Sequence, residues 1–272
     1  MDRRRKLSLA HLSLIAIPPP ELIRIAARAG FDLVDLRLSP ATPTDTIYAD
    51  DERLALCRQL APLLRDMDLK VWDVEIIRLK DATNPSDHVP LMEAAALLGA
   101  SRIKLVCDSG DPARAADLLG RLCERAAPFG LTLDLEYMVF SGVRSLSAAR
   151  ALITAANQPN LRILVDALHW MRAGDDTSSL KIAKEQLGYV QLCDGPLLAP
   201  VDREALIQEA RTNRLAPGDG EFPLDALLDA MPPNCVASLE VPLPSRRDPL
   251  AHAQRLYSTA RALADRHQRV TS

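Results

Sequence analysis

Short hydrophobic runs alternate with longer amphipathic segments along the whole sequence. The short runs are rich in leucine and β-branched residues, which favours strands, whereas segments such as PPELIRIAARAG and DPARAADLLGRLCERAAPFG have the period of amphipathic helices. Eight strands are predicted, near Leu7–Ile15, Asp32–Leu38, Leu69–Ile77, Ser101–Cys107, Leu131–Tyr137, Leu161–Asp166, Gly188–Cys193 and Cys235–Val241. Eight strand–helix alternations spaced about 30 residues apart favour a parallel β/α architecture.

Glycines and prolines mark the predicted helix ends and loops. Gly30, Gly99 and Gly130 each stand shortly before a predicted strand, where a left-handed residue commonly ends a helix. Two long proline-bearing segments, Pro40–Asp51 and Leu197–Gly220, are predicted to be loops that cover the active face.

These elements predict a single (β/α)₈ TIM barrel that spans residues 1–272 as one domain. The length fits, because barrels of this kind commonly contain about 250 residues. The rival fold is a doubly wound open sheet, which would bring a glycine-rich phosphate turn after its first strand. LSLAHLSLIAIPPPEL contains no such turn, and this favours the closed barrel.

Composition and charge narrow the class of protein further. A hydrophobic fraction of 48% with 25% charged residues is ordinary for a soluble globular protein, and a net charge of -3 argues against a nucleic-acid scaffold. No apolar run approaches the roughly 20 residues of a membrane span. The segment MDRRRKLSLAHLSLI has the order of a signal peptide, but His11 and Ser13 interrupt it and PPPE follows in place of a cleavage site. The five scattered cysteines lack a CxxC pair and fit reduced thiols, so we expect a cytoplasmic protein.

Polar residues share one face of the predicted strands. Side chains two residues apart in a strand point the same way, and in VWDVEII this sets Val74 and Ile76 against Asp73 and Glu75. DLVDLRL, SRIKLV, TLDLEY, LRILVD, YVQLCD and VASLEV show the same alternation. If the apolar face packs on the outer helices, the polar face points into the barrel.

Four inward acidic residues are expected at a similar height: Glu75, Glu136, Asp166 and Glu240. Burying an isolated carboxylate costs several kcal/mol unless it is paired or bound to a cation. Crowded carboxylates share protons or hold a metal, and a metal is the simpler explanation.

A second interpretation is that some inward charges form internal salt bridges. Asp35 or Glu75 could pair with Arg37 or Lys104, because ion-pair networks also place charges inside barrels. For these four residues, roles in salt bridges and in substrate contact both stay open.

The segments LEYMVF, VDALHW, YVQLCDGPLL, RLAPGDGEFPL and SLEVP, in that order, resemble the sugar phosphate isomerase/epimerase family of xylose isomerase-like barrels. The resemblance begins with AARAGFDLVDLRL and covers nearly the whole chain. It implies one divalent metal ion bound by residues that close the fifth to eighth strands, here Glu136, Asp166, Gln191 and Glu240. It also implies a substrate-binding histidine three residues after the aspartate, which is His169.

The seventh strand departs from the sugar-epimerase pattern, because Gln191 stands where a histidine ligand is usual. An amide oxygen among carboxylates suits Mg²⁺ or Mn²⁺ better than Zn²⁺. The bacterial 3-dehydroshikimate dehydratases, which resemble a branch of the same barrels, also carry Gln here, followed by D-x-P-L-L and a later P-G-x-G. A lyase interpretation therefore stays open. An endonuclease-type relative would need a cluster of histidines, and only five histidines are present.

The resemblance also suggests roles in catalysis. A metal chelated by a hydroxy-ketone stabilises the enediolate formed when an adjacent C–H is deprotonated. Glu136 and Glu240 are the candidates for proton transfer from opposite sides, and His169 for a hydrogen bond to a substrate oxygen, although a packing histidine is the alternative. Further candidate substrate contacts are Arg214, Arg78, Arg37, Lys104 and Glu75.

The leading hypothesis is a metal-dependent isomerase or epimerase that acts on a keto-sugar or a related hydroxy-ketone. The alternatives are a metal-dependent lyase of the 3-dehydroshikimate dehydratase type and a non-catalytic sugar-binding barrel. The expected partner is a small polyol or keto-sugar, with no nucleic acid and no membrane. Barrels of this kind often self-associate, so a homo-oligomer also stays open.

Overall fold

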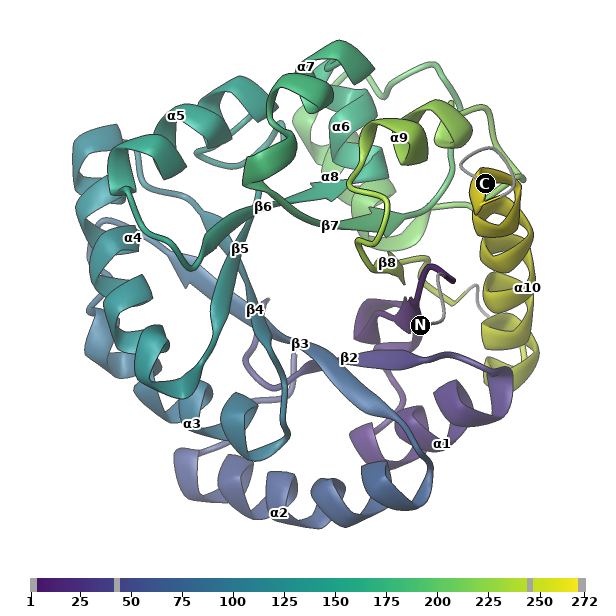
Figure 1. Cartoon of the computed structure of the whole chain (residues 1–272), viewed down its shortest axis with the longest axis horizontal. Helices are drawn as coiled ribbons and strands as arrows, with labels where there is room; N and C mark the ends of the chain where they lie inside the picture. Colours follow the sequence, from purple (N-terminus) through teal and green to yellow (C-terminus); the bar gives the residue numbers. More distant parts are fainter. Residues whose placement is uncertain (1–3, 42–44, 244–246, 269–272) are drawn as a thin grey trace.

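The predicted strands close into a parallel barrel in chain order, with β1 beside β8 (Figure 1). The computed structural model describes residues 4–41, 45–243 and 247–268. The strands are β1 (Leu7–Leu9), β2 (Leu33–Arg37), β3 (Lys70–Leu79), β4 (Arg102–Cys107), β5 (Thr132–Glu136), β6 (Leu161–Asp166), β7 (Leu187–Leu192) and β8 (Ala237–Leu239). This confirms the predicted barrel, and each predicted strand overlaps an observed one.

A ring of helices surrounds the strands (Figure 1). The helices are α1 (Pro19–Ala29), α2 (Asp50–Asp66), α3 (Val89–Leu97), α4 (Pro112–Ala126), α5 (Leu146–Ala156), α6 (Ala167–Ala173), α7 (Thr177–Ile182), α8 (Arg203–Thr212), α9 (Leu224–Ala230) and α10 (Pro249–Gln268). The apolar face of the strands packs on this ring and forms one large core. Among the described residues, no helix is long and apolar enough to cross a bilayer.

The first strand is shorter than predicted. It ends at Leu9, and His11–Leu14 forms a 3₁₀ helix. Side-chain hydrogen bonds stabilise this turn. The Ser13 hydroxyl donates to the carbonyl of Leu239 at 2.7 Å and accepts from the amide of Val241 at 2.9 Å.

The face predicted for Ile76 is wrong. The pairing of β3 with β4 shifts register between Glu75 and Ile77, and the strict alternation is lost there. As a result Ile77 joins the outer core, whereas Ile76 packs inside with Val106 and Met138. In the other strands the residues predicted to face the helices, such as Leu36, Leu105 and Leu135, belong to the outer core.

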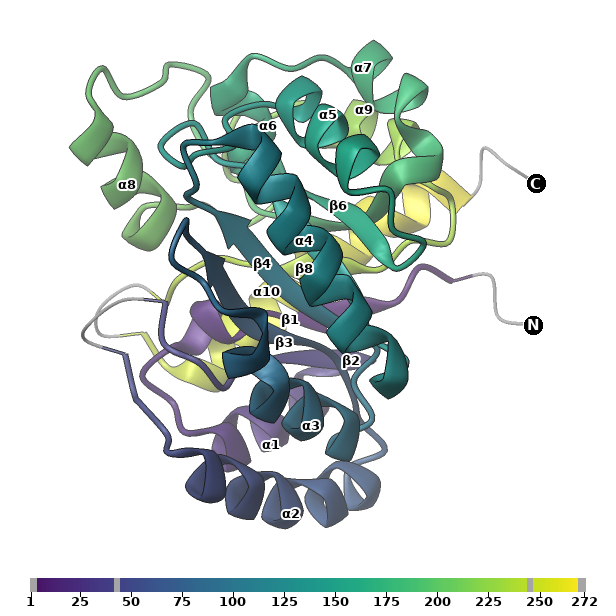
Figure 2. The ribbon, with the colours of Figure 1, turned by 90° about the vertical axis from the view of Figure 1, so that its left-hand side faces the viewer.

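The segment Leu197–Gly220 is only partly a loop. Residues 203–212 form α8, whose first turn is capped by the Asp202 carboxylate accepting from the amide of Ala205 at 2.8 Å. Figure 2 shows α8 standing apart from the helices that pack around the strands. The other predicted loop, Pro40–Asp51, includes residues 42–44, which lie outside the described residues.

Charged and aromatic side chains fill the end of the barrel away from the strand C-termini. Arg102 donates twice to the carboxylate of Asp134, at 2.7 and 2.8 Å, and its guanidinium lies 4.8 Å from the centre of the Trp72 ring. Trp72 in turn packs edge-on against Tyr189. These pairs compensate the charges at this end of the barrel.

We predict that Gly30→Ala destabilises the fold by about 1–2 kcal/mol. Gly30, Gly99 and Gly130 adopt left-handed backbone as predicted, and a Cβ at Gly30 would also lie 3.2 Å from the ring of Tyr257. Urea unfolding measures the change. Gly110→Ala is the matched control, because nothing lies within 4 Å of its Cβ position. Equal stability losses in the two variants would contradict the prediction.

Candidate active site

The four residues expected to bind a metal meet at the C-terminal mouth of the barrel. Glu136 and Asp166 are the last residues of β5 and β6, Gln191 lies one residue before the end of β7, and Glu240 directly follows β8. Asp166 and Gln191 are partners in the β6–β7 register. All four side chains are buried. The barrel therefore brings together the residues that the sequence placed on four separate strands.

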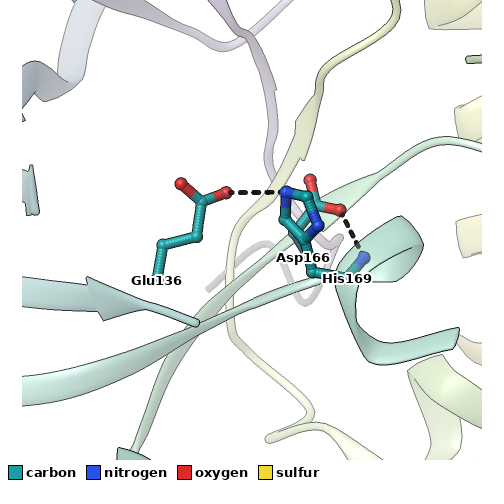
Figure 3. A group of neighbouring side chains, drawn as sticks. All are labelled: Glu136, Asp166 and His169. Carbon is teal, nitrogen blue, oxygen red and sulfur yellow. Dashed lines mark hydrogen bonds and ion pairs between the residues drawn. The ribbon is translucent and has the colours of Figure 1, made fainter. Parts of the chain in front are cut away.

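The Asp166 carboxylate both caps α6 and faces the mouth. One oxygen, Oδ1, accepts from the amides of Leu168 at 2.8 Å and His169 at 3.1 Å. The other, Oδ2, accepts from Nη1 of Arg214 at 2.5 Å. The cap fixes the start of α6 and thereby directs the His169 ring toward Glu136 (Figure 3).

Glu240 is held by two hydrogen-bond donors and by an ion pair with Arg214. Its Oε1 accepts from Nζ of Lys104 at 2.8 Å and from Nε2 of Gln191 at 3.1 Å, and its Oε2 lies 3.0 Å from Nη2 of Arg214. Burial by itself would raise the pKa of Glu240, but the charges of Lys104 and Arg214 outweigh burial and lower the pKa to about 2. Glu240 is therefore ionised at neutral pH.

The pKa of Glu136 is shifted in the opposite direction to that of Glu240. Burial raises its pKa to about 7, and the carboxylates of Glu240 and Asp166 add to the rise while Lys104 opposes it. Its nearest charged partner is the His169 ring, whose Nε2 lies 4.0 Å from Oε1 (Figure 3). The two glutamates thus differ in environment, and Glu136 is poised to gain or lose a proton near neutral pH.

His169 is a neutral imidazole in this environment. Burial lowers its pKa to about 4, and the charge of Arg214 contributes to the lowering. Its Nδ1 is buried without a hydrogen-bond partner among the described residues, and the ring packs edge-on against Phe140 at 5.4 Å. A neutral imidazole with an unused nitrogen is suited to a hydrogen bond with a bound molecule.

The mouth has the donor set of a hard divalent cation. Ligand atoms of Glu136, Asp166 and His169 lie within 4.8 Å of one another. The amide nitrogen of Gln191 donates to Glu240. Its amide oxygen is buried without a partner among the described residues and is therefore available to a cation. A set composed mainly of carboxylate and amide oxygens fits a divalent cation.

A second acidic cluster lies deeper in the barrel, formed by Asp35, Asp73 and Glu75. The hydroxyls of Ser8 and Ser238 both donate to Asp35. Burial raises the pKa of Asp35 to about 7 and that of Asp73 well above its usual value. All three side chains are buried, and Glu75 connects this cluster to the cations of the mouth.

The two inward cations expected near Glu75 both bind it. Nη2 of Arg37 lies 2.8 Å and Nζ of Lys104 lies 3.3 Å from the Glu75 carboxylate. Lys104 therefore bridges Glu75 to Glu240. The salt-bridge interpretation describes these contacts of Glu75, whereas Asp35 bonds serine hydroxyls instead.

A pocket of about 450 Å³ opens over the site. The candidate cations Arg37, Arg78, Lys104 and Arg214 line it, together with Glu136, His169 and Glu240. Arg78 also pairs with Asp108 at 2.5 Å and keeps 30% of its side chain exposed.

Sequence reasoning missed the apolar wall of the pocket and one cation. The wall consists of Ile76, Val106, Met138 and Phe140, and the cation is Arg211. The alternation of side chains could have identified Val106 and Met138, because they lie two residues beyond Lys104 and Glu136 respectively.

The profile of the xylose isomerase-like TIM barrel family matches residues 23–260. A 3-dehydroshikimate dehydratase from Pseudomonas aeruginosa is 31% identical over 230 residues, which cover 81% of this chain. The chain spans only 35% of the length of that relative.

Two solved structures share the fold at low sequence identity. The IOLI protein with a bound zinc atom has a TM-score of 0.78 at 18% identity, with 96% of this chain and 98% of that chain covered. L-ribulose 3-epimerase has a TM-score of 0.72 at 18% identity, with 98% of each chain covered. At this identity the similarity shows the fold alone.

We predict that Glu136 makes the metal-stripped protein less stable as the pH rises. The unfolded carboxyl loses its proton near pH 4.5, whereas the folded one holds it until about pH 7, so the stability present at low pH is lost between these values. In EDTA, the free energy of unfolding of the wild type should fall by about 2–3 kcal/mol more than that of Glu136→Gln between pH 5 and 8. Urea titrations at each pH measure the difference, and parallel pH profiles would contradict the raised pKa.

Proposed function

The chain belongs to the xylose isomerase-like TIM barrel family, and on that premise we propose that it is a metal-dependent lyase that dehydrates an anionic hydroxy-ketone. In the proposed site, Glu136, Asp166, Gln191 and Glu240 would hold a divalent cation. When bound, this cation would polarise the substrate carbonyl and stabilise an enolate. The reaction is of the type named for the Pseudomonas aeruginosa relative.

The charge balance of the mouth is the observation that carries this proposal. Five basic residues line the pocket, Arg37, Arg78, Lys104, Arg211 and Arg214, and five acidic residues line it or lie buried against these cations, Asp45, Glu75, Glu136, Asp166 and Glu240. Because the protein already supplies cations that match its own carboxylates, a divalent ion would leave the mouth with an excess of positive charge. An anionic substrate complements that excess better than a neutral sugar does.

The apolar wall supports the same class of substrate. Ile76, Val106, Met138 and Phe140 offer carbon surface and no hydrogen bonds from their side chains. The hydroxyl groups of an open-chain ketose would lose partners against this wall, and an unpaired buried hydroxyl is costly. A ring with a carboxylate and few hydroxyls fits better.

The environments of the two glutamates support different roles. Glu136, with a pKa of about 7, would accept the proton from the carbon next to the ketone. The electron pair would form the enolate and then expel the β-hydroxyl, to which Glu136 would return its proton, so that water leaves. Glu240, ionised and held by Lys104, Gln191 and Arg214, would act as a metal ligand.

His169 would stabilise the charge that develops during this reaction. It lies beside Glu136 at the mouth and keeps a ring nitrogen free of protein partners among the described residues. A neutral imidazole can donate a hydrogen bond to a substrate oxygen without placing a further positive charge beside the metal.

A second candidate is the isomerase or epimerase reaction that the sequence suggested first. It needs two proton-transfer groups on opposite sides of the substrate, and Glu136 and Glu240 come from β5 and β8. L-ribulose 3-epimerase has the same fold. The contacts of Glu240 with Lys104, Gln191 and Arg214 favour the lyase, because they hold its carboxylate in the ionised form.

The two reactions are distinguished by assay of the purified protein with Mn²⁺. With 3-dehydroshikimate we expect the ultraviolet band of an aromatic product to grow with time and to stop on addition of EDTA. With a panel of ketoses in D₂O we expect no deuterium uptake. Deuterium uptake without the aromatic product would favour the epimerase, and neither signal despite bound Mn²⁺ would favour a binding barrel.

We predict that Glu136→Gln lowers kcat by about 10²–10⁴-fold, because a general base is lost. Mn²⁺ binding, measured separately by calorimetry, shows whether the loss comes from chemistry or from the metal. Glu204→Gln is the control, since Glu204 is an exposed glutamate on α8. A Glu136→Gln variant that binds Mn²⁺ and keeps at least half of wild-type kcat would rule out Glu136 as the base.

A further inference from the structure

The guanidinium of Arg214 lies between two of the proposed metal ligands. Nη1 is 2.5 Å from Oδ2 of Asp166, and Nη2 is 3.0 Å from Oε2 of Glu240. The side chain is only 2% exposed, and its Nε donates to the carbonyl of Ala210 at 2.7 Å. A fixed positive charge thus bridges the carboxylates that close β6 and β8.

This bridge engages the last free oxygens of both carboxylates. The other oxygen of Asp166 already accepts two amides at the start of α6, and the other oxygen of Glu240 already accepts Lys104 and Gln191. Gln191 and Glu136 differ, because the amide oxygen of Gln191 has no partner and Glu136 accepts no hydrogen bond among the described residues. Half of the proposed ligand set is therefore open, and half is held by Arg214.

We propose that Arg214 is a built-in counter-ion that leaves Asp166 and Glu240 when a divalent cation binds, and that its released donors then bind the anionic group of the substrate. The proposal rests on the metal site of the proposed function. A guanidinium and a metal ion compete for the same lone pairs and repel each other at short distance in a buried site. When Arg214 leaves, the carboxylate oxygens become available to the metal ion, and the repulsion between the guanidinium and the metal ion is reduced.

The surrounding structure allows the side chain to move while its backbone stays in place. Leu215, the next residue, forms a two-way backbone pairing with Asp194 at 2.8 and 2.9 Å. The Asp194 carboxylate accepts from the amides of Gly218 and Phe222 and so holds the segment that follows. Arg214 also lines the 450 Å³ pocket, which offers its guanidinium space on the substrate side.

Two consequences follow for binding. The metal should bind before the anionic substrate, because only the metal frees the donors of Arg214. By linkage, the metal and the substrate anion should each raise the affinity for the other.

Calorimetric titration of Mn²⁺ alone into the full chain tests the competition. Arg214→Met keeps similar bulk without charge, and we expect it to bind Mn²⁺ about tenfold more tightly than the wild type, which is about 1.4 kcal/mol. Arg211→Met is the matched control, because it removes a cation from the same pocket rim that has no contact with Asp166 or Glu240 among the described residues. We expect its affinity to stay within about threefold of the wild type.

The outcomes separate this proposal from the metal site itself. Equal or weaker binding by Arg214→Met, with a wild type that binds Mn²⁺, overturns the role of Arg214 and leaves the metal site intact. No Mn²⁺ binding by either protein overturns both. If Arg214→Met binds Mn²⁺ and the wild type does not, Arg214 competes with the metal strongly enough to prevent its binding, which supports the proposal.

A measurement on the wild type covers the case in which Arg214→Met does not fold. Phenylglyoxal modifies accessible arginines, and peptide mass spectrometry reports each site separately. We expect Arg214 to be protected without metal and to become at least about threefold more reactive with saturating Mn²⁺, because burial governs access of the reagent. Unchanged or slower modification of Arg214 in the presence of bound Mn²⁺ would overturn the proposal.

Discussion

The mouth of this barrel depends on the mutual compensation of buried charges. Opposite charges alternate across the interior: Arg37 meets Glu75, Glu75 meets Lys104, Lys104 meets Glu240, and Arg214 joins Glu240 to Asp166. Each ion in this row would be strongly destabilising alone, since an unpaired buried charge costs several kcal/mol. Together they keep a group of carboxylates ionised in a place from which most water is excluded. Glu136 stands beside the row, and burial raises its pKa to about 7, whereas the neighbouring cations lower the pKa of Glu240 to about 2.

The sequence predicted the barrel and the identity of the inward side chains because both follow from local regularities. A strand with period two has to present Asp35, Glu136 or Glu240 on the face opposite its leucines, whatever the rest of the chain does. Ile76 escaped the prediction because a register shift in β3 has no signature in the sequence. Arg214 was a predicted substrate contact, but its ion pairs with Asp166 and Glu240 could not be predicted. Its reach into the site depends on the backbone pairing of Leu215 with Asp194 and on the path of the segment before it, and both are tertiary features.

The protonation states of the two glutamates also lay beyond sequence reasoning. Glu136 and Glu240 look equivalent along the chain, each at the end of a leucine-rich strand. Their partners make them different, because Lys104, Gln191 and Arg214 all converge on Glu240 while Glu136 faces a neutral imidazole. An arrangement with one proton-exchanging carboxylate and one permanently charged carboxylate is asymmetric, and an elimination that uses a single group as base and then acid matches that asymmetry.

The pairing of Asp194 with Leu215 has a consequence for how such a protein can evolve. The chain leaves the barrel after Asp194 and returns at Leu215, so the twenty residues between them, α8 included, form an excursion whose two ends are joined. Substitutions in the excursion before Ala210 would leave the strand ends and the charged row in place, whereas Ala210 and Arg214 itself belong to the site. Leu197, Leu198 and Val201 are already largely exposed there, so their replacement would disturb little packing. Related proteins could therefore differ in the residues at the pocket rim, and so in substrate range, while they keep the same residues at the strand ends.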